Sequence, residues 1–123
     1  METFRVRRVY DDPDPADGGP RVLVDRLWPR GVSKERADID EWLKDVAPSE
    51  ELRSWLHQDV SRYEEFVSRY GKELDDARHK DAMGHLRELG RKEPVTLVTA
   101  VKDVDHSHIP TLLRRLSPDR RRR

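Results

Sequence analysis

Residues 21–31 read RVLVDRLWPRG, and this stretch decides the fold class. It contains four aliphatic residues, Val22, Leu23, Val24 and Leu27. Their positions place apolar side chains on both faces of an extended segment, which is typical of an interior strand covered on both sides. Pro29 and Gly31 then break regular structure. The stretch therefore predicts a buried strand that ends in a charged turn.

A second stretch, residues 95–101, has the same character. It reads VTLVTAV, is apolar on both faces and is rich in β-branched residues, so it predicts another interior strand. Residues 3–10 alternate between apolar and polar side chains, as a half-exposed edge strand does. The sheet is therefore expected to have three strands.

Helices are expected between the two interior strands and after the second. Asp38 and Glu41 form a capping box for a short helix, and Ser49 can cap the next. Ser61 and Glu64 suggest a long helix to about residue 78, and a further one stops at Gly90. Residues 109–116 form the last helix, with Pro110 in its first turn. Helical crossovers make the central strand pair parallel. The prediction is a small α/β protein with four to five helices.

Composition limits the function classes. The 123 residues fit a single domain, with a loop over residues 10–20 and a basic tail over residues 117–123. There are 25 basic and 25 acidic residues, so global charge favours neither nucleic acid nor an anionic membrane. The absence of cysteine excludes disulfides, cysteine nucleophiles and cysteine-ligated metals in this chain. No apolar run reaches membrane-spanning length and no signal sequence is visible, so a cytoplasmic protein is expected.

The charged residues after the two interior strands define a candidate site. Parallel strands place their carboxyl ends on one side of the sheet, where ligands of open α/β sheets bind. Two groups of side chains would meet there: Asp25, Arg26, Trp28 and Arg30 after the first strand, and Thr99, Lys102, Asp103 and His108 after the second. The amino end of the last helix would point to the same place. Clustered basic groups are typical of anion recognition, with phosphate or carboxylate as the ligand.

Each of these residues also has a structural interpretation. Asp25 and Arg26 can pair to fix the turn, Trp28 can belong to the core, and Lys102 can pair with Asp103. Arg53 and His57 share a helix face, which is solvated unless that helix packs over the strand ends. The Asp-rich loop and the pair His106 and His108 lack a matched set of metal ligands, so neither a metal nor a cofactor is predicted.

Several motifs carry a resemblance to a known family. VLVDRLWPRGVSK, EWLKDVAPSEELRSWLHQD, FVSRYGKEL and VTLVTAVKD occur in that order, followed by SH before the last helix. The chain resembles the YeaO-like proteins of domain-of-unknown-function family 488 from about residue 5 to residue 116. The resemblance implies a small α/β domain without an established activity. It implies recurrent polar positions at Asp25, Arg26, Arg30, Ser49, Arg53, His57, Lys102 and His108. Thr99, Val101 and Ser107 depart from the family pattern, which leaves any amide contact at position 107 in doubt.

Three functional hypotheses follow. The first is an anion-binding pocket for a phosphate- or nucleotide-containing ligand, with Arg26, Arg30, Arg53 and Lys102 supplying charge. If it is an enzyme, His57 or His108 would transfer the proton and Asp25 would orient its partner. The second is a nucleic-acid or protein-binding module that uses surface arginines, including the tail Arg120–Arg123. The third is an interaction domain in which the charged string is structural. A monomer or a homodimer, with no membrane partner, fits each of them.

Overall fold

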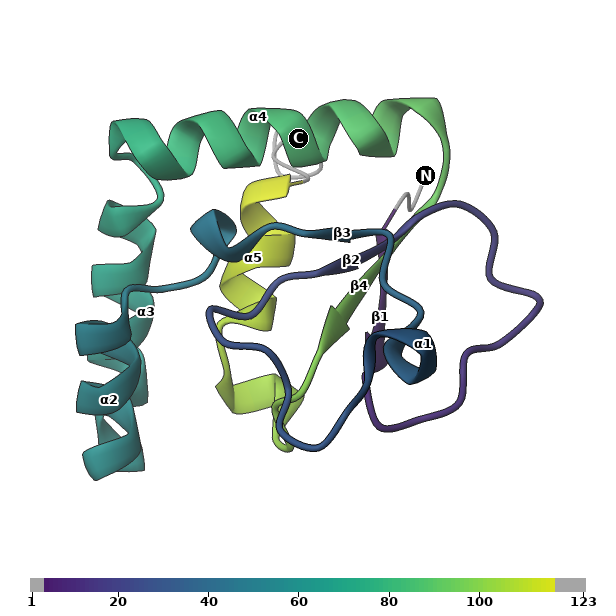
Figure 1. Cartoon of the computed structure of the whole chain (residues 1–123). Coiled ribbons are helices and arrows are strands. Elements are labelled where there is room, and N and C mark those ends of the chain that lie inside the picture. Colours follow the sequence, from purple (N-terminus) through teal and green to yellow (C-terminus); the bar gives the residue numbers. More distant parts are fainter. Residues whose placement is uncertain (1–3, 117–123) are drawn as a thin grey trace.

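The computed structural model describes residues 4–116 and shows one parallel sheet with helices around it (Figure 1). The four strands are β1 (Phe4–Arg8), β2 (Arg21–Leu23), β3 (Glu41–Trp42) and β4 (Val95–Thr99). Their order is β1-β4-β2-β3, and every neighbouring pair is parallel. The α/β class, the parallel central pair β2 and β4, and the edge position of β1 agree with the sequence prediction.

The expected strand number was wrong, because the sheet has four strands and not three. β3 lies where the Asp38–Glu41 capping box predicted a helix. Asp38 instead ends the short helix α1 (Lys34–Ala37) in the left-handed conformation, with φ of 53°. The Asp40 carboxylate then accepts a hydrogen bond from the Arg21 backbone N–H at 2.8 Å. This tertiary contact aligns residues 41–42 with β2, and it outweighs the local capping pattern.

The helix predicted from Ser61 to about residue 78 is shorter and ends at Glu73, and the further helix predicted to stop at Gly90 begins at Ala77 and ends at Lys92. The described helices after α1 are α2 (Glu50–Gln58), α3 (Tyr63–Glu73), α4 (Ala77–Lys92) and α5 (Ile109–Leu116). Asp76 separates α3 from α4, because its carboxylate caps α4 by accepting from the His79 N–H at 2.9 Å. Ser61 does not cap α3, since its hydroxyl donates to Asp59 at 2.7 Å. Ser49 caps α2 and Pro110 lies in the first turn of α5, as predicted.

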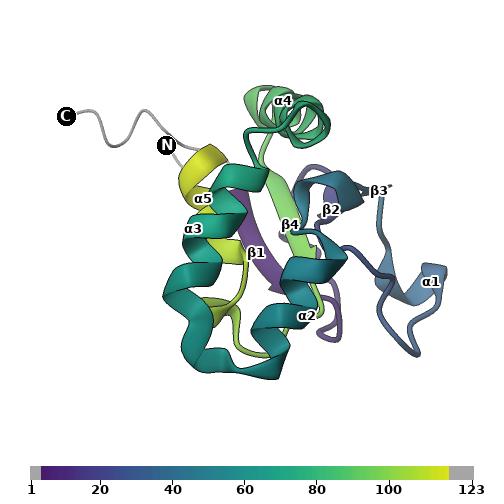
Figure 2. The same ribbon diagram turned by 90° about the vertical axis from the view of Figure 1, so that its left-hand side faces the viewer.

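The helices form unequal layers around the sheet. Helices α2, α3 and α5 gather on one side, α1 lies on the other, and α4 crosses one end of the strands (Figure 2). The larger core lies under α2 to α5 and includes Val22, Val24 and Leu97. A smaller core under α1 contains Leu23 and Val98. Alternate residues of β2 and β4 therefore serve two cores, as their two apolar faces predicted.

Three 3-10 turns complete the described chain. They are η1 (Lys44–Val46), η2 (Val60–Arg62) and η3 (Val104–His106). η1 leads from β3 toward α2, and η3 leads from β4 toward α5. The segments around these turns pass near the carboxyl ends of β2 and β4, and they supply much of the candidate site described next.

Candidate functional site

A cavity of about 870 Å³ opens beyond the carboxyl ends of β2 and β4. Nine residues that the sequence predicted for a site line it: Asp25, Arg26, Trp28, Arg30, Arg53, His57, Lys102, Asp103 and His108. Thr99, which the sequence placed in the same group, is buried and does not line the cavity. Helix α2 packs over the strand ends, which brings Arg53 and His57 to the same cavity as the other seven. Parallel topology therefore assembles these residues in one place, while their chemical roles stay predictions.

Asp25 links the ends of the two central strands. Its Oδ1 accepts from the Thr99 hydroxyl at 2.7 Å, and its Oδ2 accepts from the Ala100 backbone N–H at 2.8 Å. His108 Nε2 lies 3.5 Å from Asp25 Oδ1. Asp25 does not pair with Arg26, so the structural interpretation of that dipeptide as an ion pair does not hold. The carboxylate instead fixes the turn that follows β4.

His108 lies deep in the cavity wall and is only 6% exposed. Its Nε2 is 2.9 Å from the Val24 carbonyl oxygen. Burial lowers the pKa of His108 below the usual histidine value, although the Asp25 carboxylate and the Val24 carbonyl act in the opposite direction. The neutral imidazole is therefore the form that the folded protein favours near neutral pH.

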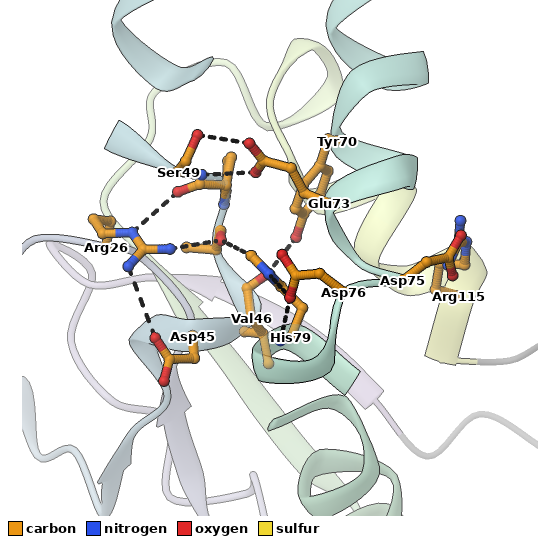
Figure 3. A network of polar contacts seen from close by, with 12 residues as sticks. Arg26, Asp45, Val46, Ser49, Tyr70, Glu73, Asp75, Asp76, His79 and Arg115 are labelled. Atoms are coloured by element: carbon orange, nitrogen blue, oxygen red, sulfur yellow. Dashed lines mark hydrogen bonds and ion pairs between the residues drawn. The ribbon is translucent and has the colours of Figure 1, made fainter. Parts of the chain in front are cut away.

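Arg26 braces the cavity wall rather than leaving its charge free (Figure 3). Its Nη2 donates to the Ala47 carbonyl and its Nε to the Pro48 carbonyl, both at 3.1 Å. His79 Nε2 lies 3.0 Å from the same Ala47 oxygen, so one carbonyl holds two partners. An Asp45 carboxylate lies 3.8 Å from the Arg26 guanidinium. Much of the hydrogen-bonding capacity of Arg26 is therefore used within the fold.

The same wall is held from the other side by α3 (Figure 3). Glu73 accepts from the Ser49 backbone N–H at 2.8 Å and from the Ser49 hydroxyl at 2.6 Å. The buried Tyr70 hydroxyl donates to the Val46 carbonyl, and burial raises the pKa of Tyr70 well above its usual value. These contacts fix residues 46–49. The family position Ser49 thus acts here as a helix cap and an anchor.

The remaining basic side chains of the cavity differ in whether they form ion pairs. Arg53 pairs with Glu50 on its own helix at 3.0 Å. Within residues 4–116, no acidic group forms an ion pair with Arg30 or Lys102, and both residues are exposed at the cavity. Asp103 pairs with His106 at 2.9 Å and not with Lys102. Arg30 and Lys102 are therefore the cations best placed to meet an anion from solvent.

The amino end of α5 leaves fewer backbone N–H groups without a hydrogen-bond partner than the sequence suggested. The Ser107 hydroxyl accepts from the Ile109 N–H at 3.1 Å, and Pro110 has no N–H to offer. Ser107 thus takes a capping position, where the family pattern has an amide. A helix end whose first donor is occupied attracts an anion less than a free end does.

Apart from Trp28, the sequence did not point to the apolar side chains of the cavity. In the described chain, three large apolar residues are exposed, namely Tyr10 at 41%, Leu27 at 55% and Val60 at 76%, and all three line this cavity. Leu27 was predicted inside the strand, but β2 already ends at Leu23. Val60 stands between polar residues in the sequence, and this isolated apolar position is the one signal that was available. The buried Leu56 and Phe66 extend the apolar lining inward.

Over residues 4–116, no three His, Asp or Glu side chains come together in a way that could hold a metal ion. The helices in this same part of the chain fall short of the length and apolar content that crossing a bilayer requires.

Comparison with known proteins decides the family. A family model described as the inactive DUF488-N3 subclade matches residues 3–123. The chain belongs to this YeaO-like family. An uncharacterised protein of Mycobacterium tuberculosis is 49% identical to this YeaO-like chain over 113 residues, which cover 92% of each protein. The uncharacterised protein YeaO of Escherichia coli is 41% identical over 105 residues, covering 85% of this chain and 89% of its own. No solved structure matches significantly.

Proposed function

We propose that this YeaO-like protein binds a small organic anion in the cavity at the strand ends, without catalysis. One observation carries the proposal: the three exposed large apolar side chains of the described chain line the same cavity as Arg30 and Lys102. Exposed apolar groups that gather at one concave place are typical of binding sites. A ligand that contacts both the apolar side chains and the two basic side chains has an apolar body and an acidic group.

The size and charge of the cavity fit this ligand class. A volume of about 870 Å³ lies within the range of pockets for small molecules and cofactors. Arg30 can hold a phosphate or carboxylate through two parallel N–H groups, and Lys102 adds a point charge. A nucleotide has both an apolar base and a phosphate, so nucleotides belong to the class, as do aromatic phosphates and carboxylates.

Two points support binding rather than catalysis. Asp25 already accepts hydrogen bonds from Thr99 and Ala100, so its carboxylate serves the fold. The family model that matches the chain is described as an inactive subclade. The nucleic-acid alternative uses surface arginines, including the tail Arg120–Arg123. That tail lies outside the described residues, and the balanced charge of the chain gives the alternative no further support.

The test is a ligand screen by thermal shift, with isothermal titration calorimetry of the hits. The panel contains adenosine 5′-monophosphate, phenyl phosphate, benzoate and inorganic phosphate at constant ionic strength. We expect the organic anions to raise Tm, because a ligand that binds only the native state stabilises it. Inorganic phosphate lacks the apolar body, and we expect a smaller shift.

Paired variants connect any hit to the cavity. The double variant Arg30→Ala/Lys102→Ala should lose the shift while keeping its own melting transition. The control is Arg91→Ala. Arg91 is an exposed residue of α4 that pairs with Glu88 and does not line the cavity. Binding that survives in the double variant, or an absence of binding by every organic anion, would contradict the proposed function.

A further inference from the structure

The proton on the His108 ring can be placed from its neighbours. Nε2 lies 2.9 Å from the Val24 carbonyl oxygen, and a carbonyl oxygen only accepts hydrogen bonds. Nε2 therefore carries a hydrogen and donates it to Val24. Asp25 Oδ1, at 3.5 Å from the same nitrogen, is a second acceptor on that side. Both neighbours favour the tautomer with the proton on Nε2.

The other ring nitrogen, Nδ1, is left as a hydrogen-bond acceptor. It has no hydrogen-bond partner among residues 4–116. His108 is only 6% exposed and lines the cavity, so the cavity is where a ligand can reach this ring. The neutral ring that burial favours leaves a lone pair on Nδ1.

The charges around the cavity orient a bound anion. The Asp25 carboxylate is close to His108, so it repels an acidic group from the deep part of the cavity. Arg30 and Lys102 are exposed and attract that group to the mouth. The part of the ligand that reaches His108 is therefore its uncharged end.

We infer that the ligand donates a hydrogen bond to His108 Nδ1, so that its class is an organic anion with a hydroxyl or N–H group on its apolar part. This inference rests on the proposed function and narrows it. Simple acyl and alkyl anions fall outside the class. Hydroxylated aromatic acids and nucleotides, whose bases and sugars carry N–H or O–H donors, fall within it.

Matched ligands test the inference on the wild-type protein. The first arm consists of phenyl phosphate, its 3-hydroxy and 4-hydroxy derivatives, and the methyl ethers of these two derivatives. The second arm consists of benzoate and its derivatives with the same substituents. We expect at least one hydroxylated compound to bind about three- to tenfold more tightly than its parent, the net effect of one hydrogen bond. Its methyl ether should lose the gain, because it cannot donate. The two arms distinguish a phosphate from a carboxylate as the acidic group.

Nitrogen NMR of histidine-labelled protein supplies the second measurement, and it needs no variant. Long-range proton–nitrogen spectra should show His108 with its proton on Nε2, and its Nδ1 resonance should move with the tighter hydroxylated ligand and not with the parent. The inference is wrong if the hydroxylated ligands and their parents bind with equal affinity and the Nδ1 resonance does not move. It is also wrong if the proton is found on Nδ1. Either result would leave the proposed function intact. If no phosphate or carboxylate in either arm binds, the proposed function fails as well.

Discussion

Arginine side chains hold much of this protein together by donating to backbone carbonyls. Arg8 Nε donates to Val101 at 3.0 Å, and Arg21 donates to Asp38 and Ala37 at 2.9 Å. Arg26 does the same for the wall of the cavity. The sequence predicted Arg26 at the strand ends, and the side chain lines the cavity there. The sequence could not show that the Arg26 guanidinium donates to backbone carbonyls. An arginine that binds an anion and one that stabilises a loop can stand at the same position after a strand.

We expect Arg26→Ala to lower the free energy of unfolding by about 1–3 kcal/mol, the usual range for hydrogen bonds made by a charged group. The loss leaves the Pro48 carbonyl without this donor in a buried loop. Chemical denaturation measures the effect. Arg53→Ala is the matched control, since Arg53 pairs with Glu50 on the surface of one helix and should cost less than about 0.5 kcal/mol. Equal midpoints for Arg26→Ala and the wild type would refute the bracing role.

His108 should give the protein a pH dependence below neutrality. Burial lowers its pKa in the folded state, whereas the unfolded value is about 6.5. As the pH falls below about 6.5, the unfolded chain binds the proton first, so the free energy of unfolding decreases toward the folded-state pKa. Above about 6.5 the ring is neutral in both states and contributes no slope.

Proton NMR of the His108 ring over a pH series tests this directly. We expect the His108 titration midpoint to lie below 6.5, and denaturation at pH 5.5 to show lower stability than at pH 7.5. A midpoint above 6.5 would show that the Asp25 carboxylate outweighs burial at this site.

At the scale of elements, the sequence patterns gave the wrong boundary at two places. Asp38 and Glu41 have the spacing of a capping box, yet residues 41–42 form β3 because Asp40 binds the backbone of Arg21. The apolar stripe of α3 ends at Leu74, and Asp76 begins a new helix. Both boundaries depend on a side-chain contact. A capping residue in the sequence does not show which helix it caps until its hydrogen-bond partner is known.

Helix α4 packs tightly on β1 at one glycine and not at another. A Cβ atom added to Gly90 would lie 2.5 Å from Phe4 Cζ, whereas one added to Gly84 meets nothing within 4 Å. We expect Gly90→Ala to destabilise the protein by about 1–3 kcal/mol through overpacking. Gly84→Ala, in the same helix, should stabilise it by up to about 1 kcal/mol through helix propensity. Equal effects of the two substitutions would contradict this packing.

At the scale of the molecule, topology was the most predictable property. Two apolar strands separated by helices imply a parallel pair, and a parallel pair implies one shared edge for the residues that follow each strand. Asp25 and His108 do lie near each other, although more than 80 positions of sequence separate them. Topology does not predict the exposed apolar residues Tyr10, Leu27 and Val60, because their exposure depends on where β2 ends and how η2 turns.

Binding of an organic anion in the cavity beyond β2 and β4 can be tested by titrating nitrogen-labelled protein with adenosine 5′-monophosphate and recording backbone amide spectra. We predict that the perturbed amides fall in residues 25–31, 53–61 and 100–109, while those of residues 84–92 in α4 stay in place. Unchanged spectra at millimolar nucleotide, or perturbations centred on α4, would contradict the claim.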